Sequence, residues 1–120
     1  MLAFGVGGTI CALGQVVLLW LLGLGLRESQ AGAYTSAIMI GVGATLTGLG
    51  IYDEIGSVGG MGSALPITGF ANSIVSPAME FKREGFILGV SAKMFNVAGP
   101  VIVYGLLSAA LVTAALLVLR

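Results

Sequence analysis

The sequence predicts an all-α integral membrane protein: a small bundle of three to four transmembrane helices with a broken or re-entrant Gly/Pro-rich segment. Three observations lead there. First, 58% of the residues are apolar and only 8% are charged, whereas a soluble domain carries about 25% charged residues. Second, the charges leave four uncharged windows, at 1–26, 29–52, 55–79 and 94–119, each about as long as a membrane-spanning helix. Third, the central window is polar and interrupted by proline.

Spanning helices are expected at about 3–26, 33–52 and 97–119, within one transmembrane domain over residues 1–120. The first and last are strongly apolar, with runs such as LLWLLGLGL and LVTAALLVL. The second is bracketed by Tyr34 and Tyr52, which fit the aromatic positions at a membrane interface.

The segment at about 56–80 is expected to be broken. It is rich in Gly, Ser, Thr and Asn, and Pro66 and Pro77 each remove a backbone donor and free a carbonyl that lipid cannot satisfy. Two alternatives stay open: short broken helices or a re-entrant loop, and a fourth, kinked span inside the bundle. The positions of Lys and Arg do not decide the orientation.

A further helix is expected at about 77–96, because Ser76 followed by Pro77 is typical of a helix start. At about 100° per residue, one of its faces carries two lysines, an amide and a close-approach glycine; the residues are Lys82, Phe86, Gly89, Lys93 and Asn96. Such a stripe suits an anionic solute. The alternative is that the lysines only reach lipid phosphates.

Uncharged polar residues of the broken segment are candidates for a solute path or gate. Half-helix N-termini inside a membrane protein can hold carboxylates without a formal charge. The alternative is that the hydroxyls only repair backbone bonds broken by proline. With Lys82, Lys93 and Asn96, the predicted path comprises Ser63, Pro66, Thr68, Asn72, Ser73 and Ser76.

Small residues predict close helix packing, since they let helices approach in lipid. The pairs are Gly8 with Ala12, Ala44 with Gly48, and Gly85 with Gly89, and the amide of Gln15 is expected to bond across helices. The stretch GVGGTICALG at 5–14 also resembles GVGATLTGLG at 41–50. Related helices packing through a shared glycine face would explain this repeat, and so would low complexity.

Composition also excludes several functions. The chain has no histidine and one cysteine, Cys11, so no metal site or cofactor is expected. No nucleophile can be paired with a base, and the protein is not expected to be an enzyme. A net charge of zero offers no footprint for nucleic acid.

Four groups of motifs resemble a known family: GGTICALGQ at 7–15, GLGIYD at 48–53, PITGFANS at 66–73, and SPAMEFKREG with NVAGPVIVYG in the second half. Over nearly its whole length the chain resembles the stage V sporulation protein A (SpoVA) membrane proteins, in the SpoVAC/SpoVAEb branch. The second half is closer to the AC type and the short N-terminus is more like the AE type; the AC type is preferred.

The resemblance implies a location in the inner membrane of the bacterial endospore. It implies uptake of dipicolinic acid, as its calcium chelate, during sporulation and its release at germination, together with other SpoVA proteins. The AC type is also linked to mechanosensitive channel activity. A homo- or hetero-oligomer in contact with membrane lipid is expected. The alternative function is a non-conducting assembly subunit of a spore membrane complex.

Overall fold

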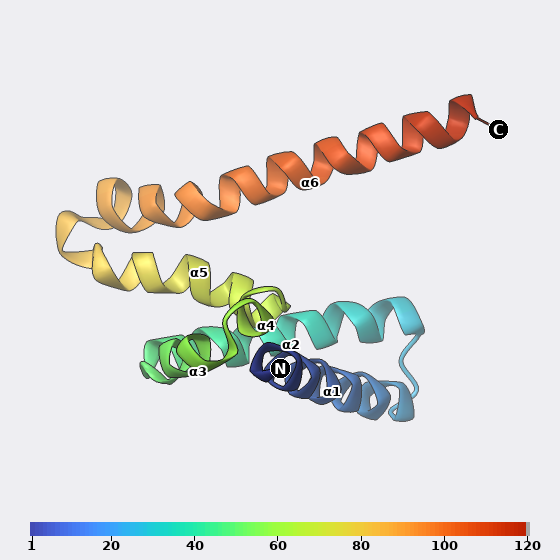
Figure 1. Ribbon diagram of the computed structural model, residues 1–120, viewed down its shortest axis with the longest axis horizontal. Coiled ribbons are helices and arrows are strands. Elements are labelled where there is room, and N and C mark those ends of the chain that lie inside the picture. Colours follow the sequence, from blue (N-terminus) through green and yellow to red (C-terminus); the bar gives the residue numbers. More distant parts are fainter. Residues whose placement is uncertain (120) are drawn as a thin grey trace. The chain divides into compact units, whose positions relative to one another are not determined.

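The computed structural model describes residues 1–119, and every element in that range is a helix. The predicted all-α fold class is therefore confirmed. The helices form two compact units, residues 1–76 and a second unit that begins at Pro77 (Figure 1).

Within the described residues 1–119, two helical stretches are long and apolar enough to cross a membrane. One is α1 (Leu2–Gly23). The other runs from Phe86 to Val118 and joins the π-helical turn η2 (Phe86–Ser91) to α6 (Ala92–Val118). A third span exists only if α2 (Glu28–Gly48) and α3 (Ile51–Gly59) are taken together as one bent span.

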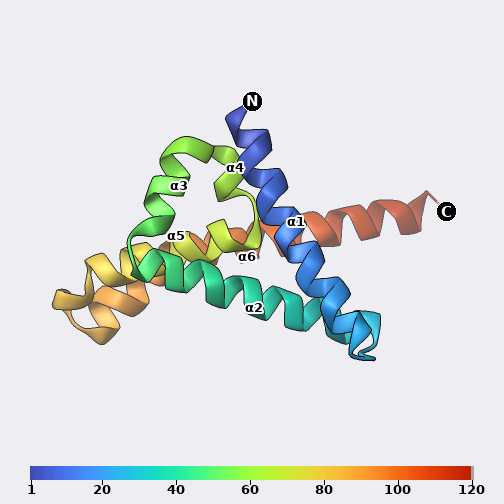
Figure 2. The same cartoon turned by 90° about the horizontal axis from the view of Figure 1, so that it is seen from below.

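The predicted second span at 33–52 follows α2 as far as Gly48, but the helix does not continue straight to Tyr52. α2 ends at Gly48, and α3 leaves it at an angle of 103° (Figure 2). Gly50 lies between them with φ +75°, a conformation that only glycine adopts without strain. The bend turns Tyr52 inward, so that only 3% of it is exposed, instead of leaving it at an interface.

The predicted break in the central segment is confirmed at Pro66. α3 ends at Gly59, Gly60 follows with φ +49°, and the single turn α4 (Met61–Ala64) leads to Leu65 and Pro66. Pro66 has no N–H to continue the turn. α5 (Ile67–Glu80) begins directly after it.

The predicted helix start at Pro77 is wrong, because Pro77 lies inside α5. Proline is tolerated within membrane helices where neighbouring groups satisfy the freed backbone. The chain turns later, through Phe81, the 3₁₀ turn η1 (Lys82–Glu84) and Gly85 with φ +101°. A continuous helix at 77–96 is therefore absent, and α6 begins at Ala92.

The repeated glycine stretches perform the same packing task in both copies. α1 packs against α2, α3 and α4. Gly7, the third residue of the first copy, faces α4, where an added Cβ would lie 3.0 Å from the carbonyl oxygen of Gly62. Its counterpart Gly43 faces α5, where a Cβ would lie 2.9 Å from the Cα atom of Thr68. The shared glycine face therefore receives the α4–α5 segment on both α1 and α2.

Candidate functional site

The break between α4 and α5 is the centre of the candidate site, because it places polar side chains inside the first unit. Two serine hydroxyls there bond to nearby backbone carbonyls. Ser63 Oγ donates to the carbonyl of Gly60 at 2.8 Å, and Ser73 Oγ donates to that of Phe70 at 2.8 Å. These bonds agree with the alternative in which the hydroxyls bond to backbone groups near the proline breaks. They leave neither serine with a free hydroxyl proton.

The phenol of Tyr52 bonds to a backbone carbonyl and to a side chain of this segment. Its hydroxyl donates to the carbonyl of Ser63 at 2.9 Å and lies 2.7 Å from Oγ1 of Thr68. A phenol has one proton, so Thr68 is the donor in the second bond. Ser63 is 2% exposed and Thr68 is 3% exposed. Irregular backbone survives at membrane depth only when its groups are satisfied in this way.

A second polar contact joins α2 to α5. Thr47 Oγ1 lies 2.7 Å from the Oδ1 position of Asn72 and 2.8 Å from the carbonyl of Gly43. One hydroxyl proton cannot serve two acceptors fully. With the amide of Asn72 turned so that its NH₂ group faces Thr47, both bonds are made, since oxygen and nitrogen are assigned from the network. Within residues 1–119, every buried side-chain nitrogen or oxygen has a partner.

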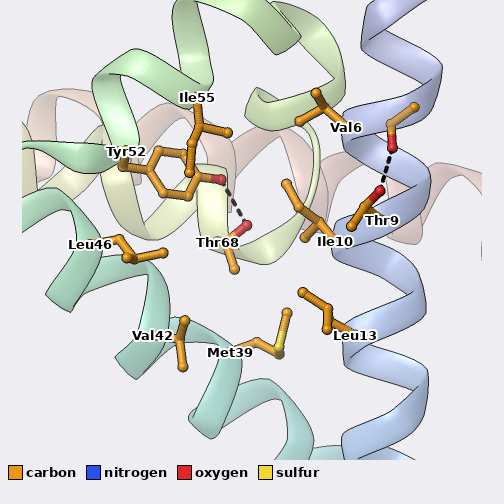
Figure 3. A pocket seen from close by; sticks show the side chains of 11 residues that line it. Val6, Thr9, Ile10, Leu13, Met39, Val42, Leu46, Tyr52, Ile55 and Thr68 are labelled. Carbon is orange, nitrogen blue, oxygen red and sulfur yellow. Dashed lines mark hydrogen bonds between the residues drawn. The ribbon is translucent and has the colours of Figure 1, made fainter.

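A mostly apolar pocket of about 350 Å³ lies beside this network (Figure 3). Its apolar wall includes Val6, Ile10 and Leu13 from α1 and Met39, Val42 and Leu46 from α2. Thr9, Tyr52 and Thr68 are the hydroxyl-bearing residues that line it, and Thr9 donates to the carbonyl of Gly5. The hydroxyl protons of Thr9, Tyr52 and Thr68 are therefore all bonded within the protein. None of them is free to bind an anionic ligand in this pocket.

Two further pockets, of about 380 and 180 Å³, border Pro66 from the side of α1. Cys11 lines both of them and is exposed. The described residues contain no group of three His, Cys, Asp or Glu side chains that could hold a metal ion.

The structure brings together only part of the predicted solute path. Ser63 and Thr68 meet through Tyr52, and Asn72 lies on the same helix as Thr68. Pro66 forms the break, while Ser73 and Ser76 are half-buried on α5. Sequence reasoning missed Tyr52 and Thr47. The local sequence gives no signal for Tyr52, because its partners Ser63 and Thr68 follow 11 and 16 residues later.

Of the predicted packing residues, Gly89 makes a close backbone approach, whereas most of the others are exposed. Gly8, Ala12, Gln15 and Gly48 are exposed, and Ala44 is half-buried. An added Cβ would meet nothing within 4 Å at Gly8, Gly48 or Gly85. Gly89 is buried, and a Cβ there would collide with the carbonyl of Phe81. Contacts of the exposed residues with another chain stay a prediction.

The predicted lysine stripe is not one helical face. Lys82 lies in η1, while Lys93 and Asn96 lie on α6, beyond the turn at Gly85. Lys82 and Asn96 are exposed, and Lys93 is half-buried. The ammonium of Lys93 lies 4.1 Å from the centroid of the Phe81 ring, a cation–π contact. This contact joins the start of α6 to the end of α5 within the second unit.

Removing this contact should loosen the turn. We expect Lys93→Met and Phe81→Leu to be coupled by about 1 kcal/mol in a double-mutant cycle, because a cation over a partly buried ring is stabilised by about that amount. The measurement is unfolding of the detergent-solubilised protein. Lys82→Met, at an exposed position, should show no coupling to Phe81→Leu. A coupling energy of zero between Lys93→Met and Phe81→Leu would contradict the contact.

Comparison with known proteins agrees with the motifs. A family model described as SpoVAC/SpoVAEB sporulation membrane protein matches residues 1–116. Stage V sporulation protein AC of Bacillus subtilis (strain 168) is 50% identical over 111 residues, which cover 92% of this chain and 74% of that protein. No solved structure is significantly similar. The predicted resemblance is confirmed, including its preference for the AC type. The chain belongs to the SpoVAC/SpoVAEB family of sporulation membrane proteins.

Proposed function

We propose that this protein is a subunit of a channel or transporter that moves dipicolinic acid, as its calcium chelate, across the inner membrane of the bacterial endospore, and that it responds to membrane tension. It acts there with other SpoVA proteins as a homo- or hetero-oligomer. In this role it catalyses no reaction and holds no cofactor. Membership of a sporulation membrane protein family supports the proposal.

The observation that carries the proposal is the polar, broken α4–α5 segment packed against apolar helices. Ser63, Thr68 and Asn72 are uncharged. Dipicolinate is a flat dicarboxylate, and its passage requires donors that bind it without trapping it. In the described conformation the hydroxyls of Ser63 and Thr68 are bonded within the protein. The path therefore opens only when this segment rearranges.

The basic side chains of the second unit supply positive charge for an anionic solute. Lys82 and Arg83 are exposed in η1, and Lys93 begins α6. Exposed cations raise the local concentration of an anion and speed its entry. We assign them to collecting the solute at the membrane surface.

The proposal is tested by dipicolinate content and release in spores that carry Asn72→Ala or Lys93→Ala. A loss of about 1–2 kcal/mol of interaction along the path predicts a roughly 5- to 30-fold change in flux in each variant. Gln30→Ala and Arg27→Ala are matched controls, because they remove an amide and a cation at exposed positions of the first unit. Normal accumulation and release in both variants, at normal protein levels, would sink the site assignment.

A second candidate function is a non-conducting assembly subunit. The observation that favours it is α6, in which residues 101–119 are exposed and almost entirely apolar. Such a helix is available to pack against helices of partner proteins. The purified protein in liposomes separates the two functions. Solute flux or tension-gated current from this protein alone favours the channel, whereas flux from other SpoVA proteins in its absence favours the non-conducting assembly role.

A further inference from the structure

Two side-chain contacts fasten the α4–α5 segment to the bent pair α2–α3. On one side of the bend, Thr47 of α2 contacts Asn72 of α5. On the other side, the Tyr52 hydroxyl of α3 bonds the Ser63 carbonyl and accepts from Thr68. Figure 3 shows the bond between Tyr52 and Thr68, with the Tyr52 side chain lining the pocket. The bend at Leu49–Gly50 therefore lies between two fastening points.

The helix that carries Tyr52 is bounded by a glycine hinge at each end. α3 has nine residues, preceded by Gly50 at φ +75° and followed by Gly60 at φ +49°. Hinges are a few terminal residues that absorb changes in backbone angle, and glycine does so at little cost. The direction of α3 can therefore change at both of its ends, and its Tyr52 hydroxyl joins it to α4 and α5.

The hydroxyl contacts are strong enough to define one conformation and weak enough to release. Both bonds of Tyr52 join neutral groups, and all three residues are at most 3% exposed. Removing one neutral hydrogen bond shifts a two-state equilibrium by roughly 2- to 10-fold. A buried charge pair would hold far more tightly and would not suit a reversible step.

We propose that Tyr52 is a positioning residue that latches α3 against the α4–α5 break, and that breaking its two hydroxyl bonds is the opening step of the solute path. This inference rests on the proposed function. The latched conformation is the closed state, because its hydroxyls are bonded to one another and to the backbone. On opening, the hydroxyls of Tyr52 and Thr68 and the carbonyl of Ser63 become available to solute or water.

The test is Tyr52→Phe, which keeps the ring and removes the hydroxyl. Tyr34→Phe is the matched control, since Tyr34 is 54% exposed. The reporter is Ala71→Cys, at a position that is 4% exposed, in a Cys11→Ala background because Cys11 is exposed. Because Tyr52→Phe removes both hydroxyl bonds, we expect a water-soluble maleimide to label the Ala71→Cys reporter roughly 4- to 100-fold faster, and dipicolinate efflux from loaded liposomes to rise by the same factor.

The two readouts separate the latch from the proposed function. Faster labelling without efflux from any variant supports the latch and overturns conduction by this protein alone. Unchanged labelling in a folded Tyr52→Phe protein overturns the latch, whatever the efflux. If Tyr52→Phe does not fold, the labelling rates of Thr68→Val and Thr68→Ser test the latch instead. Thr68→Val must label faster, while Thr68→Ser, which keeps the hydroxyl, must behave as the parent. Equal labelling of these two overturns the latch.

Discussion

Replacing Gly69 with valine is expected to destabilise the protein by about 3 kcal/mol, the upper end of the usual cost of overpacking, because the added atoms collide with backbone. A Cβ at Gly69 would collide with the carbonyl oxygen of Ser63 and lie 2.5 Å from that of Ala64. Both atoms belong to the backbone and cannot rotate away. The Ser63 carbonyl also accepts from Tyr52, so moving it loses a buried hydrogen bond.

The measurement is the fraction of protein that remains monodisperse in detergent after stepwise heating. Gly56→Val in α3 is the matched control, since a Cβ at Gly56 would meet nothing within 4 Å. It should behave as the parent protein, because valine is a somewhat better helix former than glycine. Equal stability of Gly69→Val and Gly56→Val would show that α5 does not approach the end of α4 as described.

The second large effect is expected at the glycine repeat. Gly43→Val should cost about 2–3 kcal/mol, because its Cβ would lie 2.9 Å from both the Cα atom and the carbonyl oxygen of Thr68. The equivalent Gly7→Val should cost less, since its nearest atom, the Gly62 carbonyl oxygen, lies at 3.0 Å. The same heating assay ranks the two variants.

Gly41→Val tests whether the face of α2 matters, and not glycine content alone. Gly41 belongs to the same copy of the repeat, and a Cβ there would meet nothing within 4 Å. We expect no loss of stability from Gly41→Val. If it were as harmful as Gly43→Val, the packing of α2 on α5 through Gly43 would be contradicted, and low complexity would suffice to explain the repeat.

Long apolar runs and one proline predicted the main features of the fold from the sequence. Long uncharged apolar runs predict α1 and the spanning part of α6, because inserting twenty apolar residues outweighs local detail. Pro66 predicts a break because it removes a backbone donor. The structure agrees, since α5 starts directly after Pro66. Pro77 failed as a signal because a proline inside a membrane helix loses one bond and the helix can continue.

Weaker signals decided the remaining features. The chain has 20 glycines, and positive φ angles at Gly50, Gly60 and Gly85 set the turns around α3 and before η2. Nothing in the local sequence separates these from glycines inside helices. Tyr52 resembled an interfacial aromatic because its partners, Ser63 and Thr68, follow 11 and 16 residues later. Its role depends on a bend that only tertiary packing fixes.

The helical stretch from Phe86 to Val118 is longer than the hydrocarbon core of an ordinary bilayer is thick. Its 33 residues extend over about 50 Å at about 1.5 Å per residue. The hydrocarbon core is about 30 Å thick. Even at a tilt of about 40°, the helix still extends over about 38 Å along the bilayer normal. We therefore expect the more polar end, with Lys93 and Asn96, to lie in the headgroup region. Thickening or thinning the membrane changes the preferred tilt and depth of this helix, which makes bilayer thickness a variable that acts directly on the second unit.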